Sequence, residues 1–383
     1  MKCIVNGRIL MPDGLLDGRA LVFDRRIMAI ADAAPEGAEV IDAGGGYVSP
    51  GLIDVHCHGL MGGDASHGSL QELRQMSRHK AESGVTSWLP TTMTLGWPTL
   101  EKCFSAIRQA MAESMTPDWG GAQVLGCHAE GPFINPKRKG AQTEANIQEP
   151  DIEKLRPWAD VVRLMTVAPE MPGALPFIRE AAALGVRISM GHSDATAEQA
   201  MAGIEAGARH VTHTFNAMPP LNHRQPGLIG AALNDERVYC ELIADTFHVS
   251  PLLFPLMAKL APHRLVLITD ALQCAGLPGG EYDLLGEHVT LSGIQCRLPD
   301  GTIAGSVLTL DAAVRNFAKY AGIPLWQAVG MASLHPARAI GIDDRKGSLQ
   351  VGRDADIAVT DPDFHVKMTF VGGAQVYPNN ERR

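Results

Sequence analysis

The chain has 383 residues, of which 45% are hydrophobic and 20% are charged, so it can bury the core of one large domain and a smaller one. Its formal net charge of −9 argues against sequence-independent binding to nucleic acid, which requires a basic surface. No apolar stretch approaches the roughly 20 residues that cross a bilayer, and the N-terminus lacks the apolar segment of a signal peptide. We therefore expect a folded cytoplasmic protein that binds neither nucleic acid nor membrane.

Short stretches typical of β-strands begin the chain, and similar stretches end it. The first are Lys2–Ile4, Arg19–Phe23 and Ile27–Ala31, separated by Pro-Asp-Gly and Asp-Gly turns. The last are Gly347–Leu349, Ala355–Val359 and Lys367–Val371. Neither set is large enough to bury a core alone. We therefore predict that residues 1–49 and 344–383 pair into one small β-sandwich domain that carries both termini.

Between these ends, over residues 50–343, eight apolar runs of strand length alternate with segments of helical period. The runs are Gly51–His56, Val85–Pro90, Gln123–Glu130, Val161–Val167, Arg187–His192, His210–His213, Tyr239–Ala244 and Arg264–Asp270. The helical segments are Leu70–Ser83, Leu100–Met115, Ala174–Leu184, Ala197–Ala206 and Pro251–Leu260. The stretches after Glu130 and Met218 are predicted to be long loops. Repeated strand–helix units indicate a parallel sheet, and eight of them predict an α/β fold, a (β/α)₈ TIM-like barrel.

Side chains that bind metals stand where these runs end. His56 and His58 close the first run, Glu130 the third, His192 the fifth and His213 the sixth. Active-site residues of such a barrel lie at the C-terminal ends of the strands, and residues i and i+2 of a strand face the same side. Imidazole and carboxylate ligands suit Zn²⁺ or Fe²⁺. Since the seven cysteines include no C-x-x-C pair, the pattern predicts a hydrolytic metal site and neither a thiolate zinc site nor a disulfide framework.

Three further residues near these strand ends have weaker patterns. Asp270 closes the eighth run, where we favour a catalytic carboxylate over a helix cap. His128, two residues before Glu130, is predicted to hydrogen-bond behind the ligands rather than to bind the metal. Glu170 follows the fourth run and is predicted to be structural. The other histidines are assigned to surface or packing positions: His67, His79, His210, His223, His263, His288, His335 and His365.

Five segments around these strand ends match the motifs of a known family. They are PGLIDVHCHG at 50–59, HAEGPF at 128–133, GHS at 191–193, HTFNAM at 213–218 and TDA at 269–271. Together they resemble the amidohydrolase superfamily and, within it, the family of N-acetylglucosamine-6-phosphate deacetylases. The similarity continues through residues 304–306 to residues 352–356, nearly the whole chain. PGLID with H-x-H is typical of the superfamily, whereas HAEGPF with PKRKGA, HTFNAMPPL and AGS are more specific to the deacetylases.

The resemblance implies a divalent metal held by Glu130, His192 and His213. A second ion can be held by His56 and His58 with Glu130 as a bridge. Some relatives lack the H-x-H histidines and use one metal, so one or two ions per subunit are both compatible with the sequence. Zn²⁺ is the metal we expect, with Fe²⁺, Co²⁺ and Mn²⁺ as alternatives.

The reaction implied is hydrolysis of the acetamide of N-acetyl-D-glucosamine 6-phosphate to D-glucosamine 6-phosphate and acetate, in amino-sugar catabolism. Metal-activated hydroxide is the nucleophile, and Asp270 acts as general base and then as general acid. One alternative is the galactosamine epimer as substrate. Others are a different amide hydrolase or deaminase of the superfamily, and a metal-dependent sugar-phosphate sensor without turnover.

The resemblance also implies a set of substrate-binding residues. Arg224 is expected to reach the phosphate in a neighbouring subunit's site, which implies a homodimer, and His248 is expected to contact the phosphate from the seventh loop. The cluster Lys137-Arg138-Lys139 either steers the substrate or is a solvated loop. Some relatives have a histidine after Gly140 that polarises the substrate carbonyl, whereas this chain has Ala141 and Gln142, and Gln142 can donate a neutral hydrogen bond there. The remaining positions expected to hold the sugar and phosphate are Asn216, Ala217, Ile303, Ala304 and Gly305.

Overall fold

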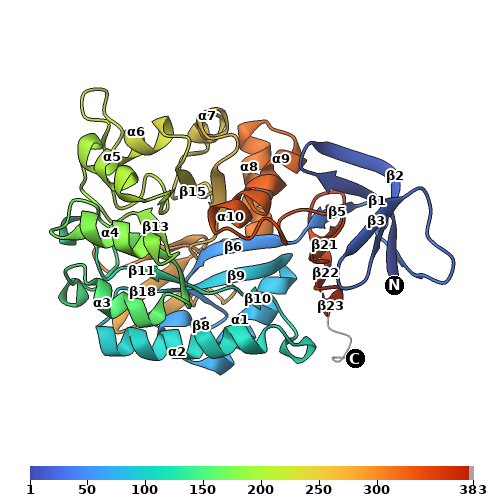
Figure 1. Ribbon diagram of the computed structural model, residues 1–383, viewed down its shortest axis with the longest axis horizontal. Helices are drawn as coiled ribbons and strands as arrows, with labels where there is room; N and C mark the ends of the chain where they lie inside the picture. The colour runs from blue at the N-terminus through green and yellow to red at the C-terminus, as the bar shows by residue number, and fades with distance from the viewer. Residues whose placement is uncertain (379–383) are drawn as a thin grey trace.

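The middle of the chain forms the expected (β/α)₈ barrel in the computed structural model, which describes residues 1–378 (Figure 1). Its strands are β6 (Leu52–Cys57), β9 (Val85–Thr92), β11 (Cys127–Glu130), β12 (Val162–Val167), β13 (Arg187–Met190), β14 (His210–Val211), β15 (Tyr239–Ile243) and β16 (Leu265–Ile268). Successive strands pair in parallel. The short strand β10 (Gln123–Val124) leads into β11 and also pairs with β9. The predicted fold class is therefore confirmed.

The barrel strands are buried on both faces, which explains their continuous apolar runs. Every residue of β6, β9 and β16 is buried. Parallel strands covered on one face by helices and on the other by the barrel interior have this composition.

A buried polar network joins the first and last barrel strands. The carboxylate of Asp54 on β6 accepts hydrogen bonds from Lys80 Nζ at 2.5 Å and from Thr269 Oγ1 at 2.7 Å. Beside it, the backbone N–H of Asp270 donates to the carbonyl of His56 at 2.9 Å. These bonds fix the position of Asp270 along the barrel axis relative to His56, at the mouth of the barrel.

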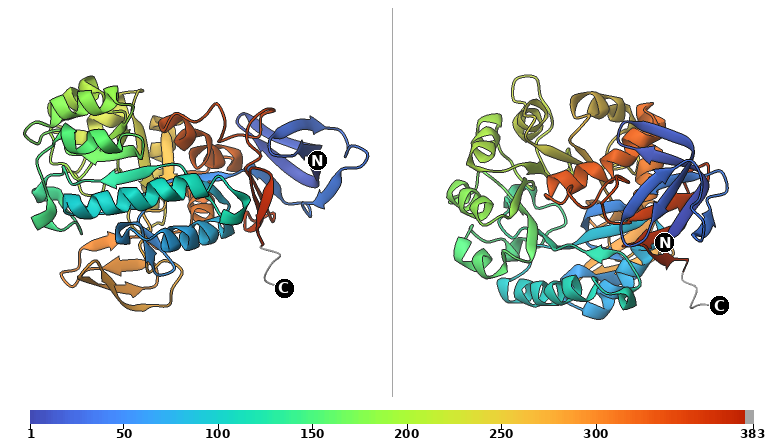
Figure 2. Two further views of the ribbon diagram at one scale, coloured as in Figure 1. Left: turned by 60° about the horizontal axis from the view of Figure 1, so that its bottom comes forward. Right: turned by 45° about the vertical axis from the view of Figure 1, so that its right-hand side comes forward.

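Helices cover the outside of the barrel (Figure 2). They are α1 (Leu70–Glu82), α2 (Trp97–Glu113), α3 (Ile152–Leu155), α4 (Ala174–Ala183), α5 (Ala197–Ala206), α6 (Gly227–Asn234), α7 (Phe254–Leu260), α8 (Leu310–Ala321), α9 (Leu325–Met331) and α10 (Leu334–Ala339). Their local sequences explain where they begin. At α5, for example, Thr196 and Gln199 form a reciprocal capping box that satisfies two free N–H groups of the first turn.

The structure differs from the predicted elements at three places. Residues 219–226 form the predicted loop after Met218, but a buried helix, α6, follows it. The expected helix at Pro251–Leu260 begins with a turn of 3₁₀-helix and becomes α-helical at Phe254. The expected strand at Gly347–Leu349 is absent, because Gly347 adopts φ +85° where a Cβ would lie 2.8 Å from the carbonyl oxygen of Ser333.

The two ends of the chain form the expected small β domain (Figure 1). Its strands are β1 (Lys2–Met11), β2 (Gly14–Phe23), β3 (Ile27–Ala31), β4 (Glu39–Asp42), β5 (Tyr47–Pro50), β21 (Ile357–Thr360), β22 (Val366–Val371) and β23 (Ala374–Tyr377). They belong to one hydrogen-bonded sheet, in which β5 pairs with β21 and so joins the N-terminal to the C-terminal segment. Phe23 and Phe370 pack edge to face across this junction, with ring centroids 5.4 Å apart.

Gly46 is required at the same junction. A Cβ at this position would lie 1.7 Å from the carbonyl oxygen of Thr360, which precludes any side chain.

A four-stranded antiparallel sheet lies between β16 and α8 and was not predicted (Figure 2, left). Its strands are β17 (Gly280–Leu284), β18 (Glu287–Ser292), β19 (Gln295–Arg297) and β20 (Ile303–Gly305). Buried apolar residues such as Leu272, Leu284 and Val289 form its core. The residue after β20, Ser306, donates its backbone N–H to the carbonyl of Asp270 at 2.8 Å. The sheet is therefore anchored beside the barrel mouth.

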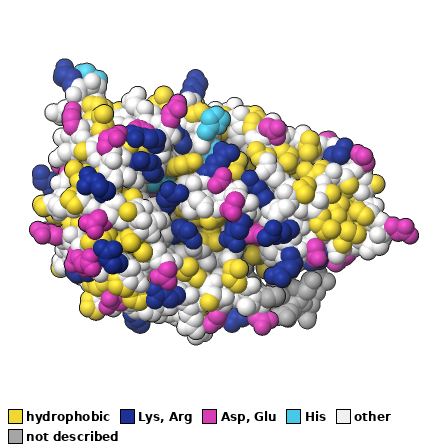
Figure 3. All heavy atoms as spheres, in the orientation of Figure 1, with side chains coloured by type: hydrophobic (Ala, Val, Ile, Leu, Met, Phe, Trp, Pro, Cys, Tyr) yellow, Lys and Arg dark blue, Asp and Glu magenta, His cyan; other side chains and the backbone are white. Residues whose placement is uncertain are grey.

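The surface carries acidic and basic side chains interspersed, while hydrophobic side chains gather toward the end formed by the β domain (Figure 3). Across residues 1–378, no helix has the length and apolar composition needed to cross a membrane. The seven cysteines are free thiols, and all are buried.

Candidate metal centre and active site

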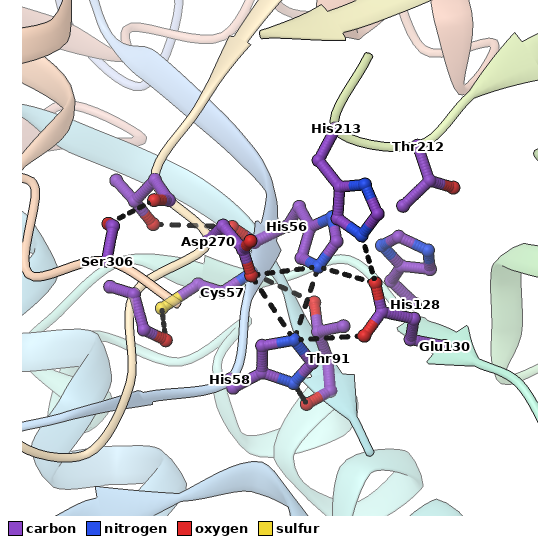
Figure 4. Close-up of polar contacts among 12 residues, drawn as sticks. His56, Cys57, His58, Thr91, His128, Glu130, Thr212, His213, Asp270 and Ser306 are labelled. Atoms are coloured by element: carbon purple, nitrogen blue, oxygen red, sulfur yellow. Dashed lines mark hydrogen bonds and ion pairs between the residues drawn. The ribbon is translucent and has the colours of Figure 1, made fainter. Parts of the chain in front are cut away.

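Five of the predicted side chains meet at the C-terminal mouth of the barrel. Figure 4 shows four of them, His56, His58, Glu130 and His213. His56 lies in β6 and His58 directly follows it, Glu130 ends β11, and His192 and His213 follow β13 and β14. They form two groups that share Glu130, one with His56 and His58 and the other with His192 and His213. In each group the candidate ligand atoms lie within 4.8 Å of one another, and every residue is buried.

The carboxylate of Glu130 lies at the centre of both groups. Its Oε1 is 3.1 Å from His213 Nε2 and 3.3 Å from His192 Nε2, and its Oε2 is 3.3 Å from His58 Nε2. Nitrogen also faces nitrogen, at 3.1 Å between the Nε2 atoms of His192 and His213, and at 3.3 Å between those of His56 and His58. Such convergence of lone pairs is the geometry expected of side chains that share a cation.

The backbone at three of these strand ends is strained. His192, His213 and Asp270 adopt φ values of 46°, 30° and 50°, a region that residues with a Cβ rarely occupy. Each of these residues turns sharply out of its strand and so points its side chain across the barrel mouth. Strain of this kind is concentrated at functional sites.

Backbone carbonyls orient two of the imidazole rings. His58 Nδ1 lies 3.1 Å from the carbonyl oxygen of Thr91, and His192 Nδ1 lies 2.8 Å from that of Arg138. A carbonyl oxygen only accepts, so each Nδ1 carries a proton and each Nε2, which faces Glu130, can bind a cation through its lone pair. The loop that contains Arg138 thus orients a candidate ligand, a role that the sequence did not reveal.

A buried carboxylate, Glu241 on β15, lies behind the site and was not singled out from the sequence. Its Oε2 is 3.0 Å from His56 Nδ1 and accepts the backbone N–H of His213 at 3.0 Å. Its Oε1 is 3.3 Å from His210 Nε2. His210, which was assigned to a packing position, is buried and faces this carboxylate.

Asp270 follows β16, the strand next to β6, and its side chain faces His56 and His58 (Figure 4). Its Oδ1 is 3.3 Å from His56 Nε2 and 3.4 Å from His58 Nε2. Burial raises the pKa of this carboxyl, but the adjacent His56 and His58 outweigh burial, so its pKa lies below the ordinary value. Asp270 is therefore ionised at neutral pH, as a general base must be.

The centre as a whole attracts positive charge. Burial raises the pKa of Glu130, but the adjacent His192 and His56 lower it by more than burial raises it. The pKa of Glu130 therefore lies well below the ordinary value. Burial lowers the pKa of His56, but Asp270 and Glu241 reverse this effect and raise it to about 9. Without another cation, protons on the imidazoles balance the carboxylates. A metal ion that binds here displaces those protons.

His128 and Glu170 lie outside both groups of candidate ligands that include Glu130. His128 Nε2 lies 2.8 Å from Thr166 Oγ1 and its Nδ1 lies 3.1 Å from the carbonyl of Val55, so both ring nitrogens are engaged. Glu170 accepts hydrogen bonds from Ser193 Oγ at 2.7 Å and from Asn135 Nδ2 at 2.8 Å. Its bonds tie together the loops that follow three strands.

Gln142 is buried against the centre, next to the half-buried Ala141. Its amide nitrogen donates to Glu130 Oε2, and its amide oxygen accepts the N–H of Thr94 at 2.7 Å. In this arrangement the amide group orients a candidate metal ligand, and its nitrogen carries a second N–H besides the one donated to Glu130.

The other predicted substrate residues lie on separate loops around the mouth. Asn216 and Ala217 follow His213 and are half-buried, and Asn216 Nδ2 donates to the carbonyl of His213 at 3.3 Å. His248 Nδ1 lies 2.6 Å from Asp245 Oδ2, which leaves its Nε2 available for a ligand. Ile303, Ala304 and Gly305 form β20.

The predicted basic residues of these loops are placed differently from one another. Arg138 donates to Asp194 at 2.8 Å, whereas Lys137 is 3.8 Å from the same carboxylate. Arg224 is exposed, and within residues 1–378 its side chain forms no ion pair. The structure thus leaves the Arg224 guanidinium available to another molecule.

The chain is similar to known proteins over nearly its whole length. Residues 47–376 match the profile of the amidohydrolase family. The N-acetylgalactosamine-6-phosphate deacetylase of Escherichia coli O157:H7 is 40% identical over 96% of this chain and 97% of that protein. The N-acetylglucosamine-6-phosphate deacetylase of Bacillus subtilis (strain 168) is 37% identical over 87% of this chain and 85% of that protein. The crystal structure of N-acetylglucosamine-6-phosphate deacetylase from Pasteurella multocida superposes with a TM-score of 0.93 at 32% identity, covering 98% of this chain and 99% of that one.

Proposed function

The chain belongs to the amidohydrolase family, and on this premise we propose that it hydrolyses the acetamide of N-acetyl-D-glucosamine 6-phosphate to D-glucosamine 6-phosphate and acetate. The observation that carries the proposal is the convergence of four imidazoles and two carboxylates at the barrel mouth. Deacetylases of both epimeric sugar phosphates match most of the chain, so the similarity includes both the barrel and the β domain.

The residues at the mouth fit a divalent cation. Glu130 Oε1 is buried and has no hydrogen-bond partner within the described part of the chain, yet three imidazole Nε2 atoms lie 3.1 to 3.4 Å from it. Glu130, His192 and His213 would hold one ion, and His56 and His58 with Glu130 would hold another. A bound divalent cation lowers the pKa of a water molecule and polarises the acetamide carbonyl. The donor set favours Zn²⁺ or Fe²⁺ over Mg²⁺, because nitrogen ligands predominate.

Asp270 is the residue we assign to proton transfer. It is ionised, its side chain is 11% exposed, and its backbone is fixed by bonds to His56 and Ser306. An ionised carboxylate at this position takes a proton from the attacking water and returns it to the amine as the C–N bond breaks. Because the amine leaves poorly as an anion, this second transfer is required for turnover.

Arg224 and His248 are proposed to bind the phosphate. Asp245 orients the His248 ring through Nδ1, and the ring donates from Nε2 to a phosphate oxygen when both of its nitrogens are protonated. Arg224 has an exposed guanidinium on a loop, and its planar fork suits bidentate phosphate binding. We propose that it acts in the site of a second subunit, which makes the working unit a homodimer.

The galactosamine epimer is a second candidate substrate. The observation that favours it is the E. coli O157:H7 relative, whose name specifies N-acetylgalactosamine 6-phosphate and which matches nearly the full length. The two sugars differ in the orientation of one hydroxyl, and the same metal centre serves both.

The test is acetate release from both epimeric 6-phosphates and from unphosphorylated N-acetylglucosamine. We expect the glucosamine 6-phosphate derivative to have the highest kcat/KM, and removal of the phosphate to lower it by on the order of 100-fold or more. A higher value for the galactosamine derivative would transfer the assignment to that epimer. Equal rates with and without phosphate would contradict the proposal and favour a different amide hydrolase.

A further inference from the structure

Glu241 is a carboxylate without any solvent exposure, in a strand whose other residues pack in the barrel. A buried carboxylate is costly unless its charge is compensated. It therefore needs an explanation beyond packing. Its contacts point to the metal centre described above.

The first contact fixes the orientation of one candidate ligand. Glu241 Oε2 lies 3.0 Å from His56 Nδ1, and an ionised carboxylate only accepts hydrogen bonds. The Nδ1 atom of His56 must therefore carry the proton. The Nε2 atom, 3.3 Å from His58 Nε2, then offers a lone pair to a cation.

The second contact joins this ligand to the other group. The same Oε2 accepts the backbone N–H of His213 at 3.0 Å, at the point where His213 leaves its strand with φ 30°. One oxygen atom thus holds the ring of His56 and the strained backbone of His213. This bond couples the positions of the two candidate metal sites.

The charge of the site supplies a third argument. Glu130, Asp270 and Glu241 bring three carboxylates into one buried volume, and within residues 1–378 no Lys or Arg forms an ion pair with any of them. One divalent cation leaves one negative charge that a protonated imidazole must balance. Two divalent cations compensate all three and leave a positive charge for an anionic nucleophile.

We propose that Glu241 is a positioning residue for the second metal ion, which it retains by fixing the tautomer of His56 and by balancing the added charge. This inference rests on the metal-dependent hydrolysis proposed above, but it concerns ion binding and not the substrate. Glu241 lies behind His56 and outside the two groups that share Glu130. It acts through His56.

The test is metal binding by Glu241→Gln, measured without substrate. The amide keeps the size of the side chain but removes its charge, and it places either an NH₂ group or a weaker acceptor against His56 Nδ1. We expect the wild-type protein to hold two Zn²⁺ ions per chain by elemental analysis after gel filtration. The variant should hold one, with the affinity for the second ion reduced by about 10- to 100-fold.

Cobalt provides a readout that a general structural role would not change. Two Co²⁺ ions that share Glu130 should give a spin-coupled paramagnetic resonance signal in the wild-type protein. Glu241→Gln should give the uncoupled signal of a single ion at equal protein concentration. The matched control is Glu170→Gln, another carboxylate at the barrel mouth whose bonds go to Ser193, Asp194 and Asn135. This control should keep two ions and the coupled signal.

Two results would overturn the proposal. One is a Glu241→Gln variant that keeps two ions with unchanged affinity, and the other is a wild-type protein that never holds more than one ion. Both results come from measurements without substrate, so neither would contradict the proposed hydrolysis, which is tested by acetate release. If Glu241→Gln loses its helical circular dichroism and so does not fold, the same measurement is made with Glu241→Asp. Aspartate keeps the negative charge but has one methylene fewer, so its carboxylate lies farther from His56. The proposal holds only if this variant binds the second ion more weakly than the wild type.

Discussion

Asp270 shows how a single residue is prepared for proton transfer. Its left-handed backbone turns the side chain toward His56 and His58, and its N–H and C=O groups are held by His56 and Ser306. The carboxylate can therefore move little when a substrate binds. A fixed, ionised carboxylate beside the candidate ligands has the position and charge required of a base.

We predict that Asp270→Asn lowers kcat for acetate release by about 10²- to 10⁴-fold, the usual contribution of a general acid–base group. The amide is isosteric, so the affinity for the sugar phosphate should stay within a few-fold of the wild-type value. Steady-state kinetics and calorimetric titration with D-glucosamine 6-phosphate would measure the two quantities. A variant that keeps more than a tenth of the wild-type kcat would exclude Asp270 as the proton-transfer group.

The site residues differ in how much of their role can be deduced from the sequence. His56, His58, Glu130, His192 and His213 are recognisable because polar side chains at the ends of apolar runs are unusual, and the barrel brings strand ends together. Glu241 lies inside a strand, where one carboxylate gives no periodic signal. Its role depends on contacts with residues 28 and 185 positions away along the chain, and only the fold brings these together.

The orientation of Gln142 could not be predicted for a related reason. Its position after PKRKGA identifies a loop near the site, but the loop folds so that the amide contacts Glu130 and Thr94. A loop of this length has many conformations, and sequence periodicity does not select one.

At the scale of elements, the barrel strands and their helices follow from period and length. The sheet β17–β20 was missed, although Val289 and Leu291 alternate with polar residues in β18 as expected for a strand with one buried face. The surrounding Gly and Pro residues conceal this alternation. The absent strand at Gly347–Leu349 is the opposite case. Its similarity to the other short runs at the chain ends indicated a strand, but a close approach to Ser333 requires a glycine turn.

Helix α10 carries a buried histidine that makes stability depend on pH. His335 Nδ1 lies 2.8 Å from the carbonyl of Leu265 on β16, and burial lowers the pKa of His335 to about 4. The unfolded chain has a histidine pKa near 6.5, so it binds the proton more readily than the folded protein does. Stability is therefore complete above pH 6.5 and is lost as the pH falls toward 4.

We predict that protonation of this histidine lowers the free energy of unfolding by about 2 kcal/mol when the pH falls from 7 to 5. In His335→Gln, which does not titrate, the decline over this interval should be smaller by that amount. Urea unfolding of both proteins at the two pH values measures the difference, and pH effects at the metal centre cancel in the comparison. Parallel declines in the two proteins would show that His335 is protonated equally in the folded and unfolded states.

At the scale of the whole molecule, the β domain ties the two chain ends together beside the barrel. Pairing of β5 with β21 joins segments more than 300 residues apart. This pairing could be predicted because neither segment buries a core alone. Its register could not, since it depends on the close approach of Gly46 to Thr360.

The proposed dimer gives a prediction that involves two chains. Arg224→Ala should lower kcat/KM by on the order of 10- to 100-fold, as expected for loss of a charge-assisted hydrogen bond. If Arg224 serves a neighbouring site, co-expression of Arg224→Ala with Asp270→Asn creates mixed dimers in which one site has both groups. Equal mixing should then restore about one quarter of the wild-type activity. Activity equal to the average of the two variants would place Arg224 in its own subunit's site or outside any site.

The central claim is that Glu130, His192, His213, His56 and His58 hold a divalent cation on which hydrolysis depends. The most direct measurement is acetate release from N-acetyl-D-glucosamine 6-phosphate by chelator-treated protein as Zn²⁺ is added back. We predict no release above the protein-free rate at the start, and a linear rise that reaches its plateau at one or two ions per chain. Full activity in the metal-free protein would contradict the account.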